Sequence, residues 1–308
     1  MIEGLFTKER NNFHLKLIND QTLNWSHLNA KDARRSGTKI APSNADGSQN
    51  FSIHVASRML TMVEQSVHKQ ARVIDSKIAG QTIGNQFEMA CESFLEATFK
   101  KLNHLRPGLW TVRQVSSRKE NEIASYEQYS HLNELARIAN NNPELKAFLG
   151  EGYTIAPDVV VTRKPETDER INESDGPVVD DNSCRASGLR MSNLKDIYTE
   201  ILHASISCKF TMRSDRAQNT RTEALNLLRS RKGRAPHIVS ITAEPTPSRI
   251  ASLAMGTGDL DCVYHFALYE LMKSVEMLDK SDSYDLLKNM VDGKRLKDIS
   301  DLPLDLAM

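Results

Sequence analysis

The sequence predicts an α/β fold in which a mixed central β-sheet is flanked by helices. Short segments rich in β-branched residues, typical of buried strands, alternate with longer segments whose apolar residues recur at helical spacing. Such alternation favours a layered sandwich of sheet and helices. The chain has 308 residues, enough for one large hydrophobic core, and we expect a single domain over residues 1–308.

The N-terminal part is predicted to be mainly helical. We expect a helix with polar breaks over residues 5–30 and a second helix over residues 52–76, where apolar residues keep a helical period. Residues 34–50 are rich in Ser, Asn, Gly and Asp, which favours a loop. Asp46 in this loop is a candidate for contact with a ligand, but an ordinary turn residue is the stronger interpretation.

A third helix is predicted to begin after the turn Gly80–Asn85 and to run to about His104. Glu88 lies near its start, next to the apolar stripe. A carboxylate there is either a surface charge favoured by the helix dipole or an inward-pointing ligand, and taken alone the surface position is the stronger interpretation. The Gln81 amide can donate and accept hydrogen bonds in a groove, but a position in a plain turn before the helix is an equal alternative.

Residues 110–115 predict a short strand, and residues 123–149 predict a helix interrupted by a proline. The next predicted strand, residues 153–163, carries Asp158 among valines. A buried aspartate there costs free energy unless it is paired or bound to metal. Pro157 indicates a bulge or an edge position that aims Asp158 outward, so we favour a functional role for this acid.

A second key segment is the largely apolar run 201–212, which predicts a buried strand with Lys209 late in it. Ser214 or Asp215 can then cap a helix over residues 216–232, with a glycine as its stop. The remaining elements complete the sandwich. We expect a long polar connection over residues 164–196, strands over 237–243 and 259–263, a loop over 244–249, helices over 264–278 and 284–291, and an irregular tail over 297–308.

The junction between the central strand and its helix combines two kinds of chemistry. Arg213, Asp215 and Arg216, which we call the recognition motif, crowd the helix start, where phosphate binds favourably. Arginine donates to guanine and aspartate accepts from the cytosine amino group, so this motif can recognise G·C base pairs. Lys209 before the motif and Glu223 two turns into the helix are a candidate catalytic lysine and carboxylate.

Composition narrows the function classes. The 40 Lys and Arg residues equal the 40 Asp and Glu residues in number. The chain therefore lacks the overall basic excess that is typical of nucleic-acid-binding proteins. Residues 209–234 are nevertheless strongly basic, which is compatible with DNA binding; a solvated surface is the alternative. The four widely spaced cysteines fit neither a zinc site nor a disulfide framework, which favours a reducing cytoplasm. We expect no signal peptide and no membrane span. The sequence contains no glycine-rich phosphate loop, which argues against a metabolic enzyme.

The candidate residues match the needs of phosphodiester hydrolysis. The reaction needs a bound metal, a deprotonated water and groups that offset the developing charge. Mg²⁺ takes carboxylate oxygens and keeps several waters, and a nearby lysine can orient the water or, if its pKa is lowered, help to deprotonate it. Asp158, Glu88, Glu223 and Lys209 supply this set if the fold brings them together. The sequence therefore predicts a DNA-cutting enzyme.

Two short segments resemble a known nuclease signature. Pro157-Asp158 followed by Ser207-Cys208-Lys209 looks like the PD…(D/E)xK pattern. Most of that superfamily has an acid two residues before the lysine, whereas this chain has Ser207, and Glu223 looks to supply the missing carboxylate. This swapped pattern is similar to type II restriction endonucleases that cut around CCGG. Other collinear segments extend the resemblance over nearly the whole chain, weakening in 164–196; they include residues 80–88, 205–226, 244–249 and 293–306.

The resemblance implies a role for each catalytic candidate. Asp158 is the central metal ligand, Glu223 replaces the displaced acid, and Glu88 supports the metal site. Lys209 positions the nucleophilic water, and the backbone carbonyl of Cys208 touches the metal. The implied cofactor is Mg²⁺, with two ions per active site.

The resemblance also implies how DNA is recognised. Arg213, Asp215 and Arg216 recognise CCGG in the major groove, the loop around Asp46 recognises part of the outer base pair, and Gln81 approaches the minor groove. The implied target is GCCGGC in double-stranded DNA, cut after the first G of each strand to leave 5′ overhangs. Nucleases of this family with a different outer pair are one alternative, and a non-catalytic, sequence-specific DNA-binding regulator is another.

A palindromic target requires two-fold symmetry, so we expect at least a homodimer. The resemblance implies a homotetramer of back-to-back dimers, in which the 164–196 loop is a candidate intersubunit contact; a mobile surface loop is the alternative. It further implies a bacterial, cytoplasmic enzyme that works beside a cognate DNA methyltransferase.

Overall fold

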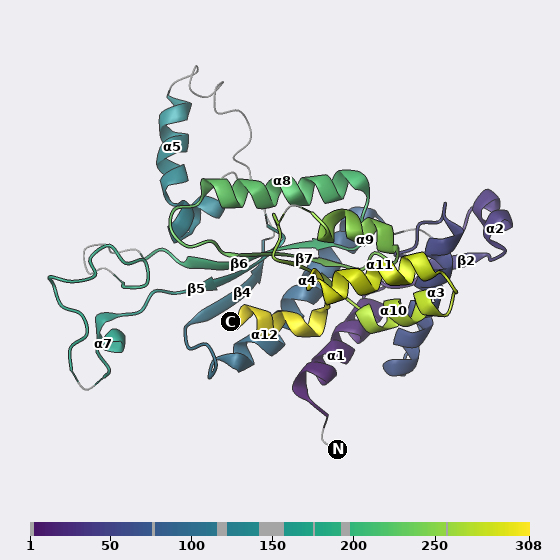
Figure 1. The fold of residues 1–308 in the computed structure, drawn as a ribbon, viewed down its shortest axis with the longest axis horizontal. Coiled ribbons are helices and arrows are strands. Elements are labelled where there is room, and N and C mark those ends of the chain that lie inside the picture. Colours follow the sequence, from purple (N-terminus) through teal and green to yellow (C-terminus); the bar gives the residue numbers. More distant parts are fainter. Residues whose placement is uncertain are drawn as a thin grey trace.

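A six-stranded mixed sheet forms the centre of the protein (Figure 1). The computed structural model describes residues 3–75, 78–115, 122–141, 157–174, 176–191, 198–256 and 258–308. The strands lie in the order of the sequence and comprise β4 (Trp110–Gln114), β5 (Val159–Arg163), β6 (Ile201–Lys209), β7 (His237–Thr242), β8 (Cys262–His265) and β9 (Leu296–Asp298). The predicted α/β class with a mixed sheet is confirmed.

The pairing of β6 explains why the chemistry-bearing residues gather at one edge of the sheet. It runs antiparallel to β5, with Val159 opposite Ile206, and parallel to β7, with Lys209 opposite Thr242. β5 is buried on both faces, which accounts for its run of valines. Because β5 and β6 are antiparallel, the residue that precedes β5 lies beside the carboxyl end of β6.

Helices cover both faces of this sheet. Helix α8 (Ser214–Ser230) lies over one face, and α1 (Leu5–Asn19) and α12 (Leu302–Leu306) lie on the other side (Figure 1). Helix α4 (Gly80–Thr98) contacts α1 as well as β4, β5 and β6. Apolar residues of these layers join one continuous core. Among the described residues, none of the helices combines the length and apolar character needed to cross a membrane.

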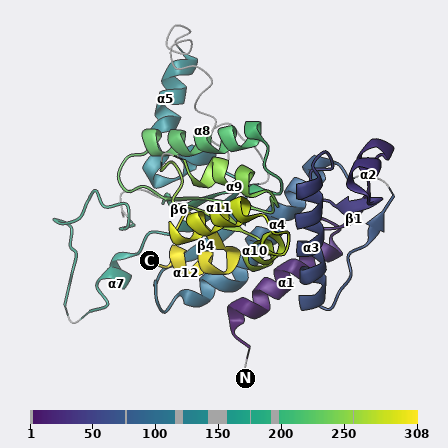
Figure 2. The same ribbon diagram turned by 45° about the vertical axis from the view of Figure 1, so that its right-hand side comes forward.

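Two parts of the chain extend from this body. A three-stranded sheet lies with the N-terminal helices at one end, and the chain around α7 projects at the other (Figures 1 and 2). The elements of these two parts are β1 (Trp25–His27), α2 (Ala30–Ser36), β2 (Ile40–Pro42), α3 (Asn50–Ser66), β3 (Val73–Ile74) and α7 (Asp168–Ile171).

Several predicted boundaries in the N-terminal part are wrong. The predicted helix 5–30 ends at Asn19, because Gln21 adopts a positive φ of 58° and the chain turns into β1. The predicted loop 34–50 contains the end of α2 and all of β2, so only residues 37–39 and 43–49 of it are irregular. The predicted helix 52–76 ends at Ser66. Strands of two or three residues are stabilised by distant partners, which local periodicity does not reveal.

The central elements also differ in detail. Helix α4 begins at Gly80, so the predicted turn lies inside the helix. The predicted helix 123–149 is replaced by two 3₁₀ turns and α5 (His131–Asn140), and residues 142–156 lie outside the described residues. Helix α8 begins at Ser214, so neither Ser214 nor Asp215 is its cap. Arg213 occupies that position without a side-chain capping bond.

The C-terminal part is more regular than predicted. Helix α9 (Pro247–Ala254) begins inside the predicted loop 244–249, with proline in its first turn. Strand β8 starts at Cys262, and the following helices are α10 (Leu268–Glu276) and α11 (Ser281–Asp292). The predicted irregular tail instead contains most of β9, a capped 3₁₀ turn and α12. Asp298 caps that turn, so the polar residues in this part of the tail are a capping signal and not a sign of disorder.

Candidate active site

The candidate site is built around Asp158, which directly precedes β5. Its Oδ2 accepts hydrogen bonds from Lys209 Nζ at 2.7 Å and from the Cys208 backbone N–H at 2.7 Å. The side chains of Asp158 and Lys209 are 15% and 19% exposed. Asp158 is therefore not in the middle of a strand as predicted, but the expected encounter of this acid with Lys209 is found.

The surrounding charges keep Lys209 protonated. Burial alone would lower the pKa of Lys209, but the carboxylates of Asp158 and Glu223 outweigh it and raise this pKa. A lysine that serves as a base needs a lowered pKa. The arrangement therefore favours orientation of water and charge stabilisation by Lys209 over deprotonation.

Glu88 and Glu223 approach the same strand end from two helices. Burial, the hydrogen bond with the Cys91 thiol and the charges of Asp158 and Glu88 raise the pKa of the Cys208 thiol well above its usual value. Glu223 acts electrostatically on Lys209, and it lines one pocket together with Pro157 and Ser207. The four predicted catalytic side chains thus lie around the end of β6, and the raised pKa disfavours the thiolate form of Cys208.

The position of Ser207 agrees with the displaced acid. Its hydroxyl lies 3.4 Å from the Thr220 hydroxyl of α8, and one turn further along that helix Glu223 lines the same pocket. A carboxylate carried by α8 can therefore reach the space that an acid at position 207 would occupy.

Glu88 has a partner that the sequence did not indicate. Gln114 at the end of β4 donates from Nε2 to Glu88 Oε2 at 2.8 Å and to Asn85 Oδ1 at 2.7 Å. The inward-pointing interpretation of Glu88 is thereby favoured over a surface charge. A polar residue at a strand end carries no signal in the sequence that identifies this contact.

The donor set suits magnesium. Asp158, Glu88 and Glu223 offer carboxylate oxygens, and Mg²⁺ binds through one or two carboxylates while it keeps several waters. Within the described part of the chain, no three His, Cys, Asp or Glu side chains form a ready-made metal cluster. One oxygen of Asp158 is held by Lys209 Nζ, so the acid is already compensated by a cation.

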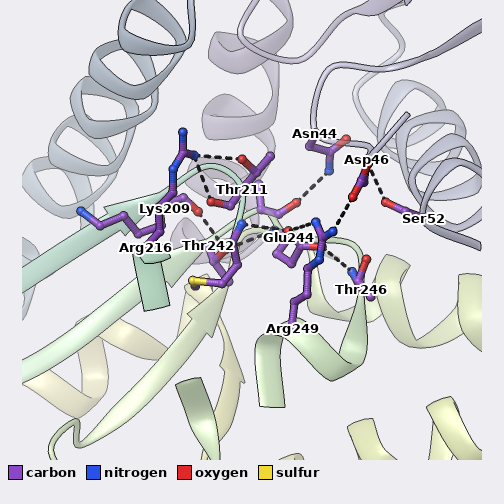
Figure 3. A network of polar contacts seen from close by, with 12 residues as sticks. Asn44, Asp46, Ser52, Lys209, Thr211, Arg216, Thr242, Glu244, Thr246 and Arg249 are labelled. Carbon is purple, nitrogen blue, oxygen red and sulfur yellow. Dashed lines mark hydrogen bonds and ion pairs between the residues drawn. The ribbon is translucent and has the colours of Figure 1, made fainter. Parts of the chain in front are cut away.

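The recognition motif continues directly from the end of β6. Arg213 and Asp215 are exposed at the start of α8. Arg216 is half-buried, and its Nη1 donates to the Thr211 carbonyl oxygen at 3.2 Å and to the Thr211 hydroxyl at 3.0 Å (Figure 3). The structure therefore places the motif beside the catalytic candidates, as expected.

Asp46 is fixed beside the same region. Burial would raise its pKa, but hydrogen bonds from Ser48 and the ion pair with Arg249 outweigh it and lower the pKa of Asp46. The backbone N–H of Asp46 donates to the Ser52 hydroxyl at 2.9 Å. Gln81, by contrast, lies exposed in the first turn of α4.

Comparison with known proteins decides the class of this protein. The family model described as NgoMIV restriction enzyme matches residues 13–308. This chain belongs to the NgoMIV restriction enzyme family. The type II restriction enzyme NgoMIV of Neisseria gonorrhoeae is 50% identical over 304 residues, which cover 99% of each chain.

Membership in the NgoMIV family confirms the prediction of a type II restriction endonuclease, a site-specific nuclease. It favours catalysis over the alternative of a non-catalytic regulator. It also agrees with the central mixed sheet flanked by helices.

Proposed function

We propose that this member of the NgoMIV family hydrolyses double-stranded DNA at GCCGGC with Mg²⁺. It cuts after the first G of each strand and leaves 5′ overhangs. The observation that carries the proposal is the contact between Asp158 Oδ2 and Lys209 Nζ, which lie 2.7 Å apart. This contact lies at the end of β6, from which the recognition motif continues. Catalysis and base recognition then share one rigid segment.

The proposed metal ligands are Asp158, Glu223 and the backbone carbonyl of Cys208, with Glu88 in support and two Mg²⁺ ions per site. Restriction enzymes of this type generally use a divalent metal. When bound, the metal supplies polarisation of the phosphate and a more acidic water.

The protein's own groups have complementary tasks. The Cys208 N–H holds the Asp158 carboxylate in a fixed orientation, because it donates to Oδ2 at 2.7 Å. Lys209 keeps its positive charge, which orients the attacking water and offsets negative charge on the phosphate.

Base recognition follows from the charges at the start of α8. Arg213 and Arg216 donate to guanines and Asp215 accepts from cytosine in the inner CCGG. Contacts with Thr211 brace Arg216 in advance. Asp46 contributes to recognition of the outer base pair.

Gln81 approaches the minor groove from the start of α4 in this proposal. Its exposed position in the first turn leaves the amide accessible to a ligand. A minor-groove contact distinguishes A·T from G·C pairs but carries less information than the major groove. Gln81 therefore supplements the recognition by Asp46.

The proposed assembly is at least a homodimer, since the target is palindromic, and a homotetramer of two dimers. The described chain around α7 projects from the body (Figure 1), which supports the 164–196 loop as an intersubunit contact. The enzyme would act in the bacterial cytoplasm, where a cognate methyltransferase protects the host's own sites.

A panel of DNA duplexes tests this proposal. Each duplex carries CCGG flanked by a different outer pair, and cleavage is measured with Mg²⁺ and with EDTA. We expect GCCGGC to be cut fastest and only with Mg²⁺. Preference for another outer pair would contradict the assignment of the outer bases, and tight, specific binding without cleavage would contradict catalysis.

A further inference from the structure

Glu244 is a buried carboxylate at the end of β7. The residue is only 1% exposed, and its two oxygens accept from two different backbone amides. Oε2 accepts from the Met212 N–H at 2.8 Å, and Oε1 accepts from the Thr246 N–H at 3.1 Å. Burial of a carboxylate costs free energy unless hydrogen bonds offset it. Each oxygen therefore holds one specific turn of the chain.

The first turn leads into the recognition motif. Met212 is fully buried and directly precedes Arg213, whose carbonyl begins the hydrogen bonding of α8. A fixed Met212 amide therefore sets the position from which Arg213, Asp215 and Arg216 extend.

The second turn leads to the loop that carries Asp46. Thr246 precedes α9, which carries Arg249, and Arg249 forms an ion pair with Asp46. Arg249 Nη1 also lies 3.8 Å from Glu244 Oε2, so the arginine sits between the two carboxylates (Figure 3).

A separate contact ties the Asp46 loop to the same point. The buried Asn44 side chain donates to the Ala243 carbonyl oxygen at 2.8 Å. Ala243 directly follows β7, so the loop meets the end of β7 through Asn44 and meets α9 through Asp46.

The same hydrogen-bond network also reaches β6, the strand that ends with Lys209. The Thr242 hydroxyl donates to the Lys209 carbonyl oxygen at 2.8 Å and accepts from the Glu244 N–H at 3.2 Å. Glu244 is thus joined to the end of β6 through its backbone as well as through its carboxylate.

We propose that Glu244 is a positioning residue that holds the CCGG recognition motif and the Asp46 loop in one fixed relation. Both parts of the target are then recognised jointly, although Glu244 touches no DNA. The inference rests on the proposed function, because the proposed function assigns the inner base pairs to the recognition motif and the outer pair to Asp46.

Glu244→Gln tests the inference with little change in size. Glutamine has one acceptor oxygen, so one of the two backbone amides must face an NH₂ group. We would measure kcat/KM on GCCGGC, on a duplex with a changed outer pair and on a duplex with a changed inner pair. Both discrimination ratios are expected to fall by about tenfold or more, since displacements near 1 Å can cost about a hundredfold.

Glu270→Gln is the matched control. Glu270 is a largely buried carboxylate that pairs with Arg10 at 2.6 Å, within the contact between α1 and α10. Its amide variant should lower Tm and leave both discrimination ratios unchanged. This comparison separates positioning of the two recognition segments from a general loss of stability.

Either retained discrimination in Glu244→Gln, or loss of only one of the two ratios, would overturn the inference. If the unaltered protein itself fails to discriminate among the three duplexes, the proposed function fails and the inference with it. If Glu244→Gln does not fold, Glu244→Asp provides the test, because aspartate keeps the charge but is too short to reach both amides. The same joint loss is expected, and retention of both ratios would overturn the inference.

Discussion

Lys209 Nζ and Asp158 Oδ2 lie 2.7 Å apart although 51 positions separate the two residues in the sequence. Antiparallel pairing of β5 and β6 produces this contact, since it places the residue before β5 beside the end of β6. The catalytic candidates are therefore aligned by backbone pairing in the core, which is more rigid than a surface loop.

Asp158→Ala should separate binding from cleavage. The substitution removes the carboxylate that is to hold the metal, while the recognition motif on α8 is untouched. We expect the variant to bind GCCGGC and to lose cleavage by about 10³-fold or more. Gel-shift assays and single-turnover cleavage measure the two properties, with the exposed Asp292→Ala as control. Metal-dependent cleavage at near-normal rates by Asp158→Ala would refute its role.

Arg213→Ala should abolish specific binding and leave the fold intact, because Arg213 is exposed. Each arginine–guanine pair is worth about 1–3 kcal/mol of discrimination. Arg229→Ala, an exposed arginine in the last turn of the same helix, is the control for loss of charge. Competition binding between specific and nonspecific DNA distinguishes the loss of specific binding in Arg213→Ala from the loss of charge in Arg229→Ala. Site-specific binding retained by Arg213→Ala would remove the residue from the recognition motif.

Arg216→Ala should show both effects. It should lose specific binding for the same reason as Arg213→Ala. It should also lose about 1 kcal/mol of stability, because its hydrogen bonds to Thr211 brace the turn before α8. Urea unfolding together with competition binding measures the pair of effects, and normal binding specificity would contradict the assignment.

Neighbouring ion pairs in β9 should differ in their effect on stability. Asp298 is fully buried and accepts from Arg10 Nε and Nη2, each at 2.9 Å. Asp298→Ala should cost about 3–5 kcal/mol, because it leaves buried donors without partners. Lys297→Ala breaks the more exposed pair with Asp305 and should cost about 0–1 kcal/mol. Equal losses for the two variants in urea unfolding would contradict this account of the core.

Acidification should weaken the protein through its buried histidines. Burial lowers the pKa of His203 to about 3 from the ordinary 6.5, so between these values the unfolded chain binds a proton that the native state does not. Stability therefore falls as pH decreases from about 6.5, by about 1.4 kcal/mol per pH unit for such a histidine.

His203→Gln should reduce this slope by about one proton, and the exposed His54→Gln should not change it. The free energy of unfolding, measured by urea titration between pH 4 and 6.5, gives both slopes. Equal slopes in the unaltered protein and in His203→Gln would show that His203 is not protected from protonation.

Asp158 and Lys209 were predictable as catalytic candidates because their signals in the sequence are local. Pro157-Asp158 next to a valine strand, and a lysine at the end of an apolar run, each break a pattern that burial imposes. The central strand, the helix that follows it and the apolar face of α4 are long and periodic, so their existence was also predictable.

The contacts that connect these parts were not predictable in the same way. Glu244 bonds with Met212, and Gln114 with Glu88, across 32 and 26 positions of sequence. Such partners depend on the register of the sheet and on how helices cross it, which no single segment encodes. The short strands β1 and β2 escaped prediction for the same reason, because each exists only through its neighbour.

We propose above all that one site of this protein cuts GCCGGC with Mg²⁺. The most direct test of this proposal is digestion of a plasmid that carries this sequence, with Mg²⁺ and with EDTA, followed by sequencing of the cut ends. We expect metal-dependent cuts after the first G in each strand. Cuts at unrelated sequences, or equal cutting in EDTA, would contradict the proposal.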